Sequence, residues 1–445
     1  MAGPLDMSLE VLGLVLLATL FAVICAGFPI SFTLMVVGFA FGYVGLGEQV
    51  FHLLTFQIFS TMMEPVLAAV ALFTFMGYLL ERAGLMDRLF RAFQLLCGSM
   101  RGSLYLATIV TATLFAAATG ITGASVTVIG LMAAPAMQKS GYSQRLAAGT
   151  ITAGGTLGIL IPPSIMLVVM GAVLELSVAR LFVAAIVPGL LLSALYLVYT
   201  LTWSYLRPAV GPPLPAAERS VSRADVLREF VVGLVPPGAL ILATLGAILS
   251  GFATPTEGAA LGCLGAVLVA LAHRRLTPWI VKDAVFRTAE TTSMVMILLT
   301  ASNFFGAVFS RFGTPRLIAE SVLGLDLPPA VLILGILVVT FVLGWPLEWV
   351  PIVVIIMPMF VPIITKLELP LLWFAILMAV TLQTCWLSPP VALSAYYLKG
   401  IMPQWELKEI YLGMAPFMLL QILGALLVFL FPELALMLPR LLYGR

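Results

Sequence analysis

The chain has 445 residues, of which 62% are hydrophobic and only 9% are charged, and its mean hydropathy is +1.15. A soluble globular protein carries about 25% charged residues, so this composition excludes a soluble fold and indicates a polytopic membrane protein. The net charge of +2 and the lack of a basic tract argue against a nucleic-acid partner. The four cysteines have no paired spacing, which favours small buried side chains over a disulfide or a metal site.

Apolar runs long enough to cross a bilayer, which takes about 20 residues, follow one another along the chain. The N-terminal run follows an acidic segment and is too long for a signal-peptide core, so we expect it to be a retained span. A polar linker over 207–228 separates two halves of similar length. The uninterrupted runs predict membrane helices at 8–26, 29–47, 64–80, 178–206, 229–250, 256–272, 288–309 and 411–432.

Four further runs are interrupted in the middle. The runs 102–138 and 328–365 each contain a short segment rich in glycine or polar residues, which predicts two re-entrant helical hairpins. The runs 145–176 and 371–402 each contain a Pro-Pro pair, and proline removes a helical hydrogen bond and clashes with the preceding turn. These two runs are therefore predicted to be broken transmembrane helices.

The positions of the breaks indicate an internal repeat. A shift of 227 residues places Pro162–Pro163 onto Pro389–Pro390 and also aligns Lys139 with Lys366. We therefore expect two copies of one unit, 1–220 and 221–445. Each copy would contain scaffold helices, one hairpin and one broken helix.

The distribution of basic residues predicts the topology. Cytoplasmic loops collect Lys and Arg, and here these residues concentrate in 81–101, 139–145, 207–228 and 273–287. All four segments can lie on one side only if 102–138 enters and leaves on the same face. The N-terminus then lies on the periplasmic side and the two repeats are inverted, although the outer loop 310–327 also carries two arginines.

Inverted repeats with a broken helix in each half are the signature of a secondary transporter with its binding site near the membrane midplane. A break frees backbone carbonyls for a cation and helix N-terminal amides for an anion. Na⁺ is a hard cation and prefers oxygen ligands. We expect the first hairpin tip to face the first break in one sodium site, formed by Thr119, Gly120, Thr122, Ser125, Gly158, Pro162 and Ser164.

The second tip should face the second break in the same way. The corresponding sodium site is predicted to contain Gly344, Trp345, Glu348, Thr384, Ser388 and Pro389. The predicted substrate-binding residues are Thr122, Gly123, Ser164, Gln383, Ser388 and Ser394. The alternative for each hydroxyl is a packing role with a hydrogen bond to its own helix.

Intramembrane carboxylates are also candidates for function. Glu348 falls in the second hairpin tip, whereas Glu64 and Glu257 each open a helix, where capping is sufficient to explain an acidic residue. Neither His52 nor His273 has a set of metal ligands nearby, so no organic cofactor and no metal other than sodium is expected.

An ordered set of motifs resembles the large membrane subunit of the tripartite ATP-independent periplasmic (TRAP) transporters. The matching segments include "GFPISFTL" (27–34), "LFAAATGITGASV" (114–126), "AAGTITAGGTLGILIPPSIMLVVMG" (147–171), "GFATPTEGAALG" (251–262) and "LSPPVALSAYYLKGI" (387–401). The resemblance implies an elevator-type transporter of the bacterial inner membrane that imports an organic acid, such as a C4-dicarboxylate or a related anion, with Na⁺. It also implies two partners, a small four-span membrane subunit and a periplasmic substrate-binding protein.

Three other functions stay open at this point. A polytopic membrane enzyme would need a nucleophile or paired acids at depth, and such residues are sparse here. An ion channel would not need inverted broken helices with closed tips. A stand-alone Na⁺/carboxylate symporter of related elevator architecture differs only in lacking the two partners.

Overall fold

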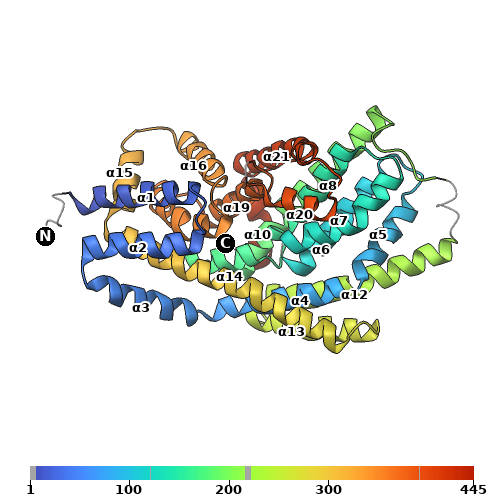
Figure 1. Cartoon of the computed structure of the whole chain (residues 1–445), viewed down its shortest axis with the longest axis horizontal. Helices are drawn as coiled ribbons and strands as arrows, with labels where there is room; N and C mark the ends of the chain where they lie inside the picture. Colours follow the sequence, from blue (N-terminus) through green and yellow to red (C-terminus); the bar gives the residue numbers. More distant parts are fainter. Residues whose placement is uncertain (1–6, 121, 216–221, 390, 445) are drawn as a thin grey trace.

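The computed structural model describes residues 7–120, 122–215, 222–389 and 391–444, without the side chains of residues 117–119 and 223. Within these ranges every regular element is a helix, and the molecule is elongated (Figure 1). Seven of the described helices are long and apolar enough to cross a membrane. The predicted all-α polytopic fold is confirmed.

The first half contains the predicted hairpin and the predicted broken helix. The hairpin is the helix pair α6–α7, and the broken helix consists of α8, one turn of 3-10 helix (η2) and α9. Helices α1 to α3 lie at one end of the molecule and the hairpin lies toward the other (Figure 1). The bounds are α1 Leu9–Cys25, α2 Ile30–Leu46, α3 Gln49–Met62, η1 Pro65–Leu67, α4 Ala68–Arg82, α5 Leu85–Leu96, α6 Ser103–Thr119, α7 Thr122–Lys139, α8 Gln144–Thr156, η2 Leu157–Ile159, α9 Ile165–Leu174 and α10 Val178–Leu206.

The second half contains the same order of elements. A hairpin (α16 to α18) is followed by a broken helix (α19, η4 and α20) and by a long helix (α21). The bounds are α12 Arg223–Leu249, α13 Pro255–Ala272, α14 Pro278–Arg311, α15 Thr314–Leu323, α16 Pro329–Leu343, α17 Trp349–Pro351, η3 Ile352–Ile356, α18 Met357–Lys366, α19 Leu371–Leu382, η4 Gln383–Trp386, α20 Leu393–Ile401, α21 Leu407–Leu430 and α22 Glu433–Tyr443. The inverted orientation of the halves and their boundary at 220 stay predictions.

Two segments that we expected to be loops are largely helical. Helix α5 lies within 81–101 and α15 lies within 310–327. Both helices are amphipathic, with one apolar face packed on the protein and one polar face exposed, so their mean hydropathy is too low to predict a membrane span. Each therefore adds a short helix directly before a hairpin.

Backbone and ion-pair contacts join the four basic segments at one face of the molecule. Backbone hydrogen bonds, each 2.9 Å long, tie both 81–101 and 139–145 to the linker, and an ion pair of 2.7 Å ties the end of α4 to α14. These contacts are Leu214 N to Gly98 O, Ser143 N to Val210 O, and Arg82 Nη2 to Asp283 Oδ2. The four basic segments thus lie close together, as predicted. That they lie on the cytoplasmic side of the membrane stays a prediction.

The broken helices form the core of the molecule. Every residue of α8 from Leu146 to Thr156 is buried, and so is every residue of α19 from Trp373 to Leu382. By contrast, α2 and α13 turn large apolar side chains outward, among them Phe32, Val36 and Leu264. Non-helical backbone in a membrane protein must be covered by protein or line an aqueous cavity, and residues 157–164 of the first break are all buried.

The two acidic residues at helix starts act as caps. The carboxylate of Glu64 accepts a hydrogen bond from the amide of Val66 (3.5 Å), and η1 follows directly. Glu257 and Thr254 form a reciprocal capping box at the start of α13. The capping interpretation of both acids is confirmed.

Candidate functional site

The first hairpin tip contacts the first break. Gly120 has a left-handed backbone (φ +62°) at the end of α6, and a Cβ atom at this position would lie 2.7 Å from the carbonyl oxygen of Pro163. A side chain therefore has no room between the tip and the break, which explains a glycine here. The predicted pairing of the first tip with the break over Ile159–Ser164 is present in the structure.

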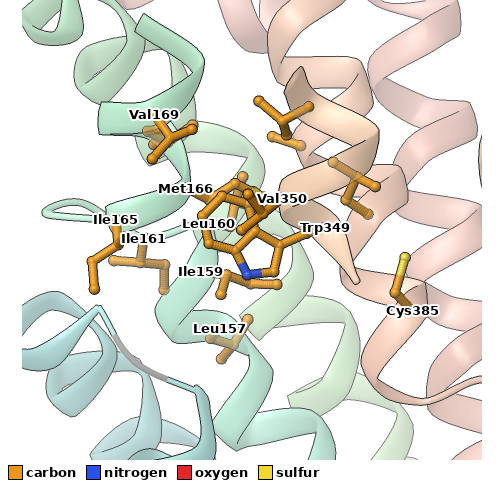
Figure 2. Packing of buried hydrophobic residues seen from close by; sticks show 14 of the residues in the cluster. Leu157, Ile159, Leu160, Ile161, Ile165, Met166, Val169, Trp349, Val350 and Cys385 are labelled. Atoms are coloured by element: carbon orange, nitrogen blue, oxygen red, sulfur yellow. The ribbon is translucent and has the colours of Figure 1, made fainter. Parts of the chain in front are cut away.

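The second tip contacts the second break in the same way. Gly344 ends α16, and an added Cβ atom would collide with the Sγ atom of Cys385 in η4. The first tip also contacts the second broken helix, because a Cβ atom on Gly123 would lie 2.9 Å from Cζ of Tyr397 in α20. Figure 2 shows Trp349, beside the second tip, among the side chains of the first break, and both line the same cavity. Both tips and both breaks thus belong to one compact unit, which we call the hairpin unit (residues 103–174 and 329–401).

The residues predicted for the first sodium site are nearly all buried. Thr122 and Ser125 are each 1% exposed in the first turn of α7, and the Thr122 hydroxyl has no hydrogen-bond partner among the described residues. Ser164 is fully buried and caps α9, since its hydroxyl donates to the carbonyl of Ile159 and accepts from the amide of Leu167 (3.4 Å). Gly158 and Pro162 are buried within the break, and the Thr119 side chain lies outside the described residues.

The second site has similar chemistry. The Thr384 hydroxyl donates to the carbonyl of Thr381 (2.6 Å), and the Ser388 hydroxyl donates to that of Thr384 (2.7 Å). Ser394 is fully buried, and its hydroxyl lacks a partner among the described residues. Glu348 is half-buried at the start of α17 and lies close enough to Tyr397 to interact with it electrostatically. The remaining predicted residues, Trp345 and Pro389, are exposed, and Pro390 lies outside the described residues.

These donor sets fit a hard monovalent cation. A hydroxyl that donates its proton to a backbone carbonyl, as those of Thr384 and Ser388 do, keeps its oxygen lone pairs free for a cation. The unpartnered hydroxyl of Thr122 is a buried oxygen whose desolvation a cation would compensate. No cluster of three or more His, Cys, Asp or Glu side chains occurs among the described residues.

A cavity of about 340 Å³ lies between the hairpin unit and the long helices α4 and α14. The hairpin unit contributes the first tip, the start of α9 and three aromatic side chains. The opposite wall consists of the ends of α4 and α14 that are predicted to lie nearer the cytoplasm. Of the residues predicted to bind substrate, Thr122 and Gly123 line this cavity. The structure places Ser164, Gln383, Ser388 and Ser394 behind its wall, in the buried core.

The sequence analysis did not identify three charged residues that line the cavity, Glu81, Arg287 and Glu290. We counted residues 81 and 287 as loop residues, whereas α4 extends to Arg82 and α14 begins at Pro278. A signal for the earlier start was available, because Thr277 followed by Pro278 is a typical helix N-terminus and the Thr277 hydroxyl accepts from the amide of Ile280 (3.3 Å).

A buried polar contact joins the two breaks. The Thr156 hydroxyl, at the end of α8, shares its proton between Ala153 O (2.8 Å) and Gln383 Oε1 (3.3 Å). It also accepts a hydrogen bond from Gln421 Nε2 (3.2 Å) on α21. Thr156 and Gln383 are 227 residues apart, which is the offset of the predicted repeat. We call Thr156, Gln383 and Gln421 the central polar contact.

Comparison with known proteins gives a consistent family. The model of the family "Tripartite ATP-independent periplasmic transporter, DctM component" matches residues 17–434. The chain is 31% identical over 349 residues to the C4-dicarboxylate TRAP transporter large permease protein DctM of Pseudomonas aeruginosa, covering 78% of this chain and 80% of that protein. It is 28% identical over 444 residues to the DctM protein of Rhodobacter capsulatus, covering 96% and 99% of the two chains.

One further relative and one solved structure are also similar to this chain. It is 31% identical over 338 residues to the isethionate TRAP transporter permease protein DctMQ of Oleidesulfovibrio alaskensis, and it spans 52% of that protein. The crystal structure of the YdaH transporter of Alcanivorax borkumensis matches with a TM-score of 0.60 at 16% identity, covering 89% of this chain and 88% of the other. This chain therefore belongs to the DctM family and is the large membrane subunit of a tripartite ATP-independent periplasmic transporter.

Proposed function

We propose that this chain is the subunit that carries an organic acid across the inner membrane in a Na⁺-driven, binding-protein-dependent transporter. In this proposal the hairpin unit binds sodium at its two tip-and-break contacts and substrate at the cavity. The hairpin unit then slides against α4 and α14 as an elevator. The relatives named above are transporter permeases, so an enzymatic role has no support.

The contact of each hairpin tip with the break of its own half is the observation that carries this proposal. A Cβ atom on Gly120 would collide with the backbone oxygen of Pro163 at the first contact, and a Cβ atom on Gly344 would collide with the side chain of Cys385 at the second. Such contacts gather carbonyl and hydroxyl oxygens in a small volume, as a dehydrated cation requires. The cavity then lies between this unit and α4 and α14, where a sliding movement would expose it to alternate sides.

We propose a periplasmic N-terminus and two partners. The face that carries the four joined basic segments is cytoplasmic by the positive-inside rule, which places the N-terminus outside in the inferred topology. The family description names a tripartite transporter, so we propose that a small membrane subunit completes the scaffold of this chain. A periplasmic binding protein would deliver the substrate.

Uptake into proteoliposomes tests the proposal. The vesicles would hold this chain with its small subunit under an inward Na⁺ gradient, and labelled organic acids would be offered with and without the binding protein. We expect uptake only when both Na⁺ and the binding protein are present. Na⁺-driven uptake without the binding protein would favour a stand-alone symporter, and Na⁺-independent uptake would contradict both.

Substitution of the two buried serines tests the sodium sites. Ser125→Leu and Ser388→Leu place a bulky side chain where each hydroxyl is 1% exposed, so we expect both variants to lose Na⁺-driven uptake. Expression and monodisperse purification should be retained. Uptake at the wild-type level in both variants would remove these residues from the sites.

A further inference from the structure

The cavity contains an excess of negative charge that the fold leaves unpaired. Arg287 is engaged by Asp283, whose two oxygens lie 3.2 and 3.1 Å from its Nε atom. Asp283 also pairs with Arg82. The other two charged residues of the cavity, Glu81 and Glu290, form no ion pair within 4.0 Å in the described part of the chain. A dianionic substrate would therefore meet two carboxylates and one guanidinium, whose Nε atom already faces Asp283.

Aromatic side chains surround the same space. Tyr78 lies on the α4 wall, and Trp349, Trp386 and Tyr397 lie on the hairpin unit. The face of an aromatic ring attracts a cation, most strongly for Trp, and aromatic side chains combined with carboxylates are the usual environment of ammonium groups in proteins. Together with Glu81, these side chains form a setting suited to a cationic nitrogen.

The hairpin-unit wall of the cavity also suits a carboxylate. The first turns of α7 and α9 both line it, through Thr122 and through Ile165, and helix N-termini present unpaired amides and a positive dipole end. Thr122 is 1% exposed and its hydroxyl has no partner among the described residues, so this buried hydroxyl can donate a hydrogen bond to a bound carboxylate. The acids of α4 and α14 thus favour a cationic group, whereas the helix starts of the hairpin unit favour an anionic group.

We propose that the substrate is a zwitterionic organic acid, with a carboxylate held at the first tip and an ammonium or quaternary ammonium group held by Glu81, Glu290 and the aromatic side chains. This inference rests on the proposed function, in that it takes the cavity as the substrate site. A cavity of about 340 Å³ accommodates a small molecule of this class. Simple C4-dicarboxylates, which carry no cationic group, are then poor substrates.

Direct binding to the purified chain with its small subunit, in lipid nanodiscs at saturating Na⁺, tests the inference. The probes are ω-amino acids, their N-trimethyl derivatives and dicarboxylates, each at several chain lengths. We expect the ammonium-bearing probes to bind about tenfold more tightly than the matched dicarboxylates. Glu81→Gln and Glu290→Gln should each weaken their binding about fivefold or more, and Trp386→Leu should weaken the trimethyl derivatives most. Glu320→Gln on α15, an exposed acid paired with Arg316 away from the cavity, is the matched control.

The outcomes separate this inference from the proposed function. Tighter binding of dicarboxylates, or binding of no ammonium-bearing probe by the wild-type chain, would overturn the inference. A change in the Na⁺ requirement of Glu290→Gln without a change in probe affinity would also overturn it, because the acids would then serve the cation. Na⁺-driven uptake of a dicarboxylate alone would keep the proposed function and reject the inference. Tight binding of ammonium-bearing probes without Na⁺-driven uptake would support the inference and reject the proposed function.

Discussion

Gly120 and Gly141 have similar left-handed backbones but very different surroundings. Their φ angles are +62° and +73°, so alanine at either position carries a strain of about 1–2 kcal/mol. A Cβ atom on Gly120 would also meet the carbonyl oxygen of Pro163 at 2.7 Å, whereas one on Gly141 meets nothing within 4 Å. The pair therefore separates backbone strain from contact between tip and break.

We predict that Gly120→Ala lowers Na⁺-driven uptake by about tenfold or more, because the tip must move off the break to admit the methyl group. Gly141→Ala should keep uptake within about twofold of the wild type, since it carries only the backbone strain. Initial uptake rates in proteoliposomes, normalised to the amount of protein, measure both. Equal loss in the two variants would mean that the tip contact has no special role.

Thr122→Val distinguishes a sodium ligand from a packing residue. The Thr122 hydroxyl is buried without a partner, so its removal should leave the sodium-free protein equally stable or stabilise it by about 1–2 kcal/mol. If the oxygen binds Na⁺, the Na⁺ concentration for half-maximal uptake should rise about tenfold. Thermal melts without Na⁺ and a Na⁺ titration of uptake measure the two effects.

Thr150→Val is the control for that substitution. Thr150 is also buried, but its hydroxyl is bonded to Leu146 O within α8 (2.7 Å) and does not line the cavity. Its Na⁺ titration should match that of the wild type. An unchanged Na⁺ titration in Thr122→Val would mean that Thr122 is a packing residue and not a sodium ligand.

At the scale of elements, the central polar contact links α8, η4 and α21. Thr156→Val removes the hydroxyl that bonds the side-chain amides of Gln383 and Gln421, which are both fully buried. We expect the substitution to cost about 2–4 kcal/mol of stability. Thr108→Val, which removes a buried hydroxyl bonded only to Leu104 O in its own helix, should cost less than about 1 kcal/mol. Chemical or thermal unfolding in the same detergent compares the two, and equal costs would mean that the contact is only local.

The elements that the sequence predicts well are those with strong apolar content or proline. The Pro-Pro pairs located both broken helices, and the glycine-containing interruptions located both hairpins, because these residues act on the backbone locally. Helices α5 and α15 were missed because hydropathy does not detect amphipathic helices that lie against a protein surface. The cavity charges were missed because Glu81 and Arg287 become neighbours only when α4 and α14 pack together. Ser164 was predicted as a ligand, and its use as a helix cap depends on the backbone path after the break.

At the scale of the whole molecule, the proposed elevator movement requires the hairpin unit to slide along α14. Gly306 of α14 faces the second hairpin, and a Cβ atom there would lie 3.9 Å from the carbonyl oxygen of Val354. We predict that oxidation of a Gly306→Cys, Val354→Cys double variant abolishes uptake and that a reductant restores it. Each single variant should be insensitive to oxidant.

A disulfide within the scaffold provides the matched control. The native Cys263 of α13 lies against the backbone of Leu72 in α4, with its Sγ atom 2.9 Å from Leu72 O. Leu72→Cys would place a second thiol beside it, and cross-linking these helices should leave uptake intact because neither belongs to the hairpin unit. Uptake that survives complete cross-linking of the Gly306→Cys, Val354→Cys variant would contradict an elevator movement along α14.

The central polar contact also has a consequence for ancestry and for chimeras. Under the predicted duplication, Thr156 and Gln383 descend from the same residue of one ancestral unit, and they now hydrogen-bond to each other. If the duplication is correct, the two copies have diverged at this position into complementary residues, and we expect a change in one to require a matching change in the other. Grafting the first half of one relative onto the second half of another should therefore yield a working permease only when the residue at position 156 from one parent complements those at positions 383 and 421 from the other.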